Sequence, residues 1–142
     1  EPDRMIKKIT SGADFFTTQI VAERESPLSL MEDLSRELDR RSVDPPFLFW
    51  SFSPIEQQKD VDFLRWLGGK IPDDIEDMVL SAEDSVNQSI RHARSIWEEL
   101  NELNQSLPVT IPMGINISFM GDRNFRNAIE LAQALQPETA PR

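Results

Sequence analysis

A glutamine and an arginine are the side chains whose chemistry best suits ligand binding. Gln19 comes late in a run of Phe, Thr and Ile residues, and Arg123 follows Gly121-Asp122 at the start of the last amphipathic segment. A side-chain amide offers donors and an acceptor, so Gln19 could bind the amide edge of a heterocycle or, equally, tie down neighbouring backbone. The Arg123 guanidinium could stack on a planar ring or hold an anion, although most arginines are simply solvated.

Aromatic and basic residues give weaker signals. Phe63 and Trp66 lie at helical spacing, which favours a place in the core over a platform for a ligand. Lys7-Lys8 precedes the first expected strand and could meet a phosphate, but a solvated surface pair is the ordinary reading. Residues 68–70 (Gly-Gly-Lys) resemble the end of a phosphate loop without its first glycine, so helix termination explains them better.

Alternating strands and helices would position these side chains. Strands are expected over residues 13–21, 47–52 and 114–120, which are rich in Phe, Ile, Val or Thr. Helices are expected over 4–10, from Ser26-Pro27 to 43, and from the apparent capping box at 53–56 to 67. Further helices are expected from Pro72 onward and over 83–104. The last helix is expected to begin at the cap Asp122, with Phe125, Ile129, Ala132 and Leu135 facing in. The run 47–52 is nearly all apolar, which is typical of a parallel strand covered on both faces.

This order predicts an α/β fold with about three parallel strands joined by helical crossovers and covered by helices. So small a parallel sheet has two unpaired edges and an inner face with little cover. The rhythm suits the C-terminal portion of a (β/α)8 TIM barrel, whose usual length is ~250 residues. Residues 1–136 would form this partial barrel and 137–142 a flexible tail. In a barrel, function lies at the carboxyl ends of the strands, where Gln19 and Arg123 are expected.

Composition excludes several classes of site. The 142 residues contain no cysteine and one histidine, His92, which excludes thiolate chemistry and any site built on two histidines of this chain. A net charge of -10 disfavours nucleic-acid binding. The longest apolar run is far shorter than the roughly 20 residues of a membrane span, so no membrane is expected. The absence of cysteine fits a reducing compartment, and we expect a cytoplasmic protein.

Three stretches resemble the methylenetetrahydrofolate reductase family. Residues 7–19 match the family's "K…aGAd…iTQ" strand, residues 63–72 match its aromatic helix leading to an "-IP-" segment, and residues 114–123 match its last strand-to-helix turn. The likeness extends through the helix to Leu135. It spans nearly all of this chain but only the C-terminal part of the family's barrel.

The resemblance implies a flavin-dependent barrel that reduces 5,10-methylenetetrahydrofolate to 5-methyltetrahydrofolate, with NAD(P)H as the electron donor and FAD as the carrier. By the family's pattern, Gln19 would hydrogen-bond the pterin, Phe63 would flank the ligand on the flavin, Arg123 would lie at the edge of that pocket, and Lys8 would meet the FAD diphosphate. No metal is implied, and no catalytic residue is assigned within this chain.

The chain departs from the family in two ways. Residues 49–53 replace a Pro-Gly-containing strand end with bulkier side chains, and the half that carries the family's general-acid glutamate and most FAD contacts is absent. The isolated chain is therefore expected to be inactive and to need a separate N-terminal half or self-association, as in a homo-oligomer. The alternatives are a folate- or flavin-binding relative acting on another one-carbon substrate, and a noncatalytic α/β subunit.

Overall fold

The fold alternates helices and strands around one small sheet. The computed structural model describes residues 1–118 and 124–136. In chain order the elements are α1 (Pro2–Thr10), β1 (Phe15–Ile20), α2 (Glu25–Arg41), β2 (Phe47–Phe52), α3 (Gln58–Trp66), α4 (Asp73–Leu80), α5 (Ser85–Ser106), β3 (Met113–Ile117) and α6 (Phe125–Leu135). The three strands are parallel in the order β1-β2-β3. The predicted α/β class and parallel sheet are thus confirmed.

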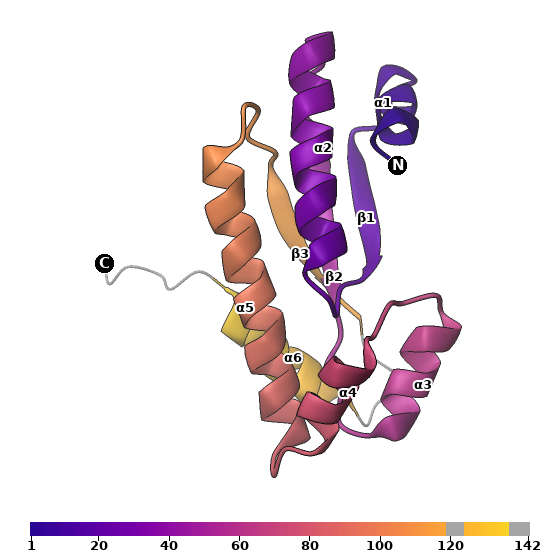
Figure 1. Ribbon diagram of the computed structural model, residues 1–142, viewed down its shortest axis with the longest axis vertical. Helices are drawn as coiled ribbons and strands as arrows, with labels where there is room; N and C mark the ends of the chain where they lie inside the picture. Colours follow the sequence, from indigo (N-terminus) through magenta and orange to yellow (C-terminus); the bar gives the residue numbers. More distant parts are fainter. Residues whose placement is uncertain (119–123, 137–142) are drawn as a thin grey trace.

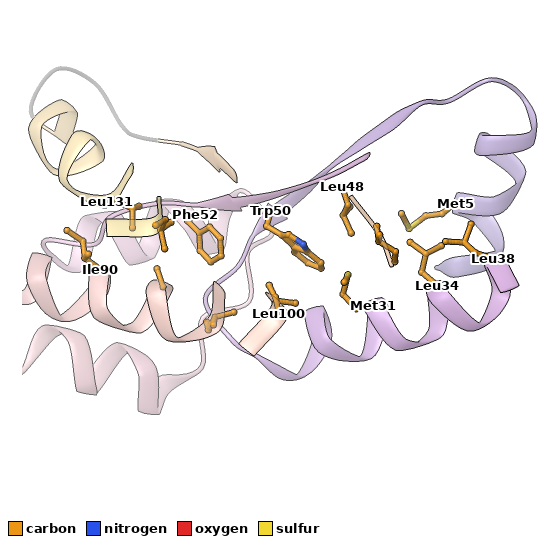
Figure 2. Packing of buried hydrophobic residues seen from close by; sticks show 14 of the residues in the cluster. Met5, Met31, Leu34, Leu38, Leu48, Trp50, Phe52, Ile90, Leu100 and Leu131 are labelled. Atoms are coloured by element: carbon orange, nitrogen blue, oxygen red, sulfur yellow. The ribbon is translucent and has the colours of Figure 1, made fainter. Parts of the chain in front are cut away.

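Helices cover one face of the sheet, and α2 and α5 lie side by side in front of it (Figure 1). Leu48, Trp50 and Phe52 point from β2 toward these helices and are at most 1% exposed (Figure 2). We call this side the covered face. Burial of its large side chains against the helices supplies the main core, which Leu131 and Leu135 of α6 complete.

The opposite side of the sheet, the open face, carries Phe15, Thr17, Phe47, Phe49 and Gly114. Phe15 is 62% exposed and Phe47 is 38% exposed. The expectation that β2 is covered on both faces is therefore wrong. From Phe47 to Trp50 the side chains alternate in burial, because successive residues of a strand point to opposite faces and only one face carries helices. At the carboxyl end of the strand Ser51 is also buried, at 2% exposed. Within residues 1–118 and 124–136, neither β1 nor β3 pairs along its length with a further strand.

Several predicted boundaries shift. α2 begins at Glu25, so Ser26 is not its cap. The capping box predicted at 53–56 does not exist, because Pro54 and Ile55 are buried in the loop and α3 begins at Gln58. A different capping box is present there: the Gln57 and Asp60 side chains pair with each other's backbone N–H groups.

The inward face predicted for α6 is also wrong in part. Phe125 and Ile129 are exposed, and the buried residues are Ala128, Leu131 and Leu135. The buried stripe is displaced because helix α6 packs on α5 and β3 through this other set of positions. Asp122, the predicted cap, lies outside the described residues.

No helix of the described residues combines the length and the apolar character needed to cross a membrane.

Candidate ligand-binding site

A row of hydrogen bonds joins the three strands near their carboxyl ends. Ser51 Oγ of β2 donates to the backbone oxygen of Thr18 in β1 at 2.8 Å, and Asn116 Nδ2 of β3 donates to the same Ser51 Oγ at 3.0 Å. The Ser51 N–H donates to Thr18 Oγ1 at 3.0 Å. These bonds bind the edge strands to β2 and place polar groups at the carboxyl edge of the sheet. Sequence reasoning missed Ser51 and Asn116; their signal was a polar residue inside an otherwise apolar strand.

The regular pairing of β1 with β2 is interrupted between Thr17 and Ile20, where the register shifts. Irregularities of this kind re-aim side chains at the rims of sheets. Gln19 lies within this interruption, is exposed, and makes no side-chain hydrogen bond to another described residue. Both the donor and the acceptor of its amide are thus available to a ligand.

Helix α3 is capped by hydrogen bonds at both of its ends. At its start the buried Asp60 carboxylate accepts from the N–H groups of Glu56 and Gln57 at 2.9 and 3.1 Å. At its end the Gly68 N–H donates to Arg65 O and the Gly69 N–H donates to Leu64 O, both at 2.9 Å.

This pattern of bonds requires a left-handed backbone conformation at the residue that follows the C-cap. Gly68 is that residue, and its φ is 90°. The prediction that residues 68–70 end a helix is therefore confirmed, and they form no phosphate loop.

Val61 and Leu64 anchor the inner side of α3 in a second apolar cluster. On the outer side of the helix Phe63 and Trp66 are exposed, Trp66 at 78%, and their ring centres lie 5.8 Å apart. The prediction that these two aromatic residues belong to the core is therefore wrong.

A cavity of about 220 Å³, the site cavity, lies between α3 and the carboxyl edge. It brings together Gln19 and Phe63, two of the predicted site residues, and Ser51 and Asn116 also line it. Thr17, Thr18, Ile20, Ser53, Leu64, Leu67 and Ser118 complete its described lining. An open amide, hydroxyl groups and an aromatic ring therefore face one space.

A second cavity, of about 270 Å³, adjoins the first across β1 and shares Thr18, Gln19 and Ile20 with it. Trp50, Leu30 and Pro27 give this second cavity an apolar floor. The Glu23 carboxylate at its mouth already accepts from the Ser26 N–H at 3.0 Å. The end of β1 is thus hollow on both sides.

The structure does not bring Lys8 to this site. Lys8 is exposed, and its Nζ lies 5.9 Å from the centre of the Phe16 ring. It belongs to α1 at the amino end of β1, whereas α3 lies beyond the opposite end of the sheet (Figure 1). Arg123 lies outside the described residues.

Among the described lining residues of the site cavity, none is titratable. The lone histidine, His92, lies on α5 with its Nε2 2.8 Å from the Ala22 backbone oxygen. The pKa of Glu37 is lowered to about 2, chiefly by the hydrogen bond from Arg40, but this pair is on α2 away from the cavity. The site cavity can therefore bind by hydrogen bonding and stacking, while proton transfer there needs a group from elsewhere.

Metal binding has no support among residues 1–118 and 124–136, where no group of three or more His, Asp or Glu side chains could hold an ion.

Comparison with known proteins finds a likeness to a solved structure. No protein-family model and no curated protein matches this chain. A solved structure is similar with a TM-score of 0.81 and 28% sequence identity: an uncharacterized protein from Clostridium thermocellum that binds two copies of 5-methyl-5,6,7,8-tetrahydrofolic acid. The likeness covers 92% of this chain and 46% of that one, so this chain spans about half the length of its structural neighbour.

Proposed function

We propose that this chain binds a reduced folate at the carboxyl edge of its sheet. One observation carries the proposal: the open amide of Gln19 and the ring of Phe63 face one cavity at that edge. The structural likeness to a protein that binds 5-methyltetrahydrofolate supports it independently.

The chemistry of the site suits the pterin ring of a folate. The pterin carries donors and an acceptor in one plane along its amide edge, and a glutamine side chain offers the complementary pair. Ser51 and Asn116, which are hydrogen-bonded to each other, add further polar groups to the lining of the cavity. Phe63 presents an aromatic ring on which a planar heterocycle stacks.

We also propose that the chain is the C-terminal part of a (β/α)8 barrel. Within the described residues, the outer edges of β1 and β3 have no neighbouring strand. The open face exposes large aromatic side chains, and a sheet face of this kind is normally covered. The structural neighbour is about twice as long, which leaves length for the remaining strands. The separate half, or a second copy of this chain, would supply them.

The variant Gln19→Ala tests the folate site. We expect it to weaken 5-methyltetrahydrofolate binding by about 1–3 kcal/mol, the usual cost of leaving a polar group buried without a partner, which here is the amide edge of the bound pterin. Isothermal titration calorimetry measures the affinity on the intact protein, by which we mean this chain together with the separate half or second copy proposed above. Thermal melting of the same sample reports stability. Gln105→Ala, an exposed glutamine on α5, is the matched control. Unchanged folate affinity in Gln19→Ala would remove the basis of the proposal.

A second candidate, favoured by the sequence resemblance, is flavin-dependent reduction of 5,10-methylenetetrahydrofolate with NAD(P)H. FAD when bound would supply the hydride chemistry. Lys8 is the one residue in the described part that the resemblance assigns to FAD, and a single exposed ammonium cannot hold that cofactor alone. The site cavity also offers no titratable group for the proton. Further contacts to FAD and a proton donor would therefore have to come from residues outside the lining of the site cavity.

Flavin content and NAD(P)H oxidation separate the two candidates. A reductase purified intact should carry flavin absorbance and oxidise NAD(P)H when 5,10-methylenetetrahydrofolate is added, whereas the 142-residue chain alone should be inactive. If the intact protein binds folate but takes up no flavin, the proposal of folate binding is supported and the reductase activity is excluded.

A further inference from the structure

Strand β1 has one residue more than β2 at the point where their register shifts. The flanking residue pairs are Thr17 with Phe49 and Ile20 with Ser51. Thr18 and Gln19 of β1 therefore share the place opposite Trp50 of β2. Such an extra residue forms a β-bulge, which is rare between parallel strands and redirects the side chains beside it. We call Thr18 and Gln19 the bulge.

The backbone is fixed on both sides of the bulge. Regular pairing with β2 precedes it, and after it the Val21 N–H donates to Ser51 O at 2.8 Å. Val21 also forms a bridge to Lys70, and Ile20 packs against the second apolar cluster. The direction of the Gln19 side chain therefore depends on the conformation of the bulge itself.

Thr18 and Ser51 hold this conformation by hydrogen bonds in both directions. The Ser51 N–H donates to Thr18 Oγ1 at 3.0 Å, and Ser51 Oγ donates to the Thr18 backbone oxygen at 2.8 Å. Each side chain thus satisfies a backbone group of the other residue at a place where the regular ladder is interrupted. Ser51 is 2% exposed, so an unpaired N–H there would be costly.

Strand β3 sets the direction of one of these bonds. Asn116 Nδ2 donates to Ser51 Oγ at 3.0 Å. A hydroxyl group has a single hydrogen, and the Ser51 oxygen that accepts from Asn116 directs that hydrogen to the Thr18 backbone oxygen. The three strands together therefore fix the bulge.

The Gln19 amide depends on this arrangement. Gln19 follows Thr18 directly, lines the site cavity, and makes no side-chain hydrogen bond to another described residue. Among the described residues its amide is thus aimed by the backbone that carries it. A binding group that is held in place before the ligand arrives loses less conformational freedom on binding.

We propose that Thr18 is a positioning residue of the folate site. Through its two hydrogen bonds with Ser51 it fixes the bulge and so aims the Gln19 amide into the site cavity. This inference rests on the proposed folate site, and it assigns to the Thr18 hydroxyl a role that acts through Gln19.

Thr18→Val removes the hydroxyl with little change in size and so leaves the Ser51 N–H without this acceptor. In the intact protein we expect 5-methyltetrahydrofolate to bind about 3- to 10-fold more weakly, measured anaerobically by calorimetry. Thr18→Ser keeps the hydroxyl and should retain the affinity. Thr10→Val is the matched control: Thr10 Oγ1 also bonds to backbone oxygens, but within α1 and away from the site cavity, so folate affinity should not change.

A double-mutant cycle with Gln19→Ala separates positioning from direct contact, because Thr18 also lines the site cavity. If Thr18 acts through Gln19, Thr18→Val should weaken folate binding no further once residue 19 is alanine. Its effect on the melting temperature should be the same in both backgrounds. Losses of affinity that simply add would overturn the proposal, since Thr18 would then act on the ligand independently of Gln19.

Unchanged affinity in Thr18→Val, or equal weakening by Thr18→Ser and Thr18→Val, would also overturn the positioning role and leave the folate site standing. If Thr18→Val does not fold, Ser51→Ala removes the other half of the pair and takes its place in the same cycle, with the same expected result. Failure of the unaltered protein to bind 5-methyltetrahydrofolate would refute the folate site itself, and the positioning role with it.

Discussion

The two faces of the sheet use the same kinds of side chain with opposite results. On the covered face Leu48, Trp50 and Phe52 are almost fully buried, while on the open face Phe15 and Phe47 remain exposed. β2 supplies residues to both faces in alternation. Hydrophobic character therefore does not determine burial here; the position of the helices does. The open aromatic face is the surface that the second half of the barrel proposed above, or a second copy of this chain, would cover.

The open face is itself divided along the strands. Toward the amino ends it is aromatic: the Phe47 and Phe49 rings lie 4.7 Å apart, and Phe15 meets Phe49 edge-on at 6.1 Å. Toward the carboxyl ends it becomes polar, with Ser51 hydrogen-bonded to Asn116. The aromatic part suits contact with protein, and the polar part suits contact with a ligand.

The largest expected effect comes from truncating phenylalanine on the two faces. Phe52→Ala should lower the free energy of unfolding by about 3–5 kcal/mol, as for other core phenylalanines. Phe15→Ala should cost at most about 0.5 kcal/mol in the isolated chain, because the ring is mostly in water. Urea unfolding of both variants measures the contrast.

The same pair tests whether the open face is covered in the intact protein. There Phe15→Ala should become markedly more costly while Phe52→Ala keeps its effect. If Phe15→Ala stays harmless in the intact protein, and that protein is monomeric by light scattering, the open face is not an interface.

Gly114→Ala should have a smaller effect on the open face. A Cβ at this position would lie 2.9 Å from the Phe47 ring and 3.0 Å from the Phe49 ring, so the rings must move. Because Phe47 is partly exposed and can shift, we expect about 1 kcal/mol, the lower end of the range for overpacking. Urea unfolding gives the cost, and near-ultraviolet circular dichroism reports the ring movement. An unchanged spectrum would show that the rings do not pack on Gly114.

Asn116→Ala should affect the polar part of the open face. It removes the donor to Ser51 Oγ, and we expect a loss of about 0.5–1 kcal/mol in unfolding free energy, the modest value of a partly exposed hydrogen bond. Binding of 5-methyltetrahydrofolate should weaken at the same time, because Asn116 lines the site cavity. Asn101→Ala, which removes a side-chain bond within α5, controls for a purely structural effect. Equal folate affinity in both variants would exclude Asn116 from the site.

The smallest effect concerns neither face. The hydrogen bond from Arg40 lowers the pKa of Glu37 from 4.5 to about 2 in the folded chain. A lowered folded-state pKa gives a stabilising contribution that is complete above about pH 4.5 and is lost as the pH falls toward 2. Glu37→Gln should therefore melt slightly below the unaltered protein at pH 7, and the difference should vanish near pH 2.

High salt should reduce this difference, since the pair is at the surface. Folate affinity should not change, because Glu37 is remote from the site cavity. A difference in melting temperature that is the same at pH 7 and at pH 2 would contradict the assigned pKa.

Local patterns in the sequence determined the three strands, their parallel alternation with helices, and the helix end at residues 68–70, because strand propensity and glycine geometry act over a few residues. They also placed Gln19 at a strand end. Only the tertiary structure decided which face of 47–52 is buried, which stripe of α6 packs inward, and that Trp66 stands in solvent beside the cavity. Each of these depends on where a helix distant in sequence comes to lie, and side-chain chemistry alone cannot specify that. The row from Thr18 through Ser51 to Asn116 likewise exists because three separate strands align in register.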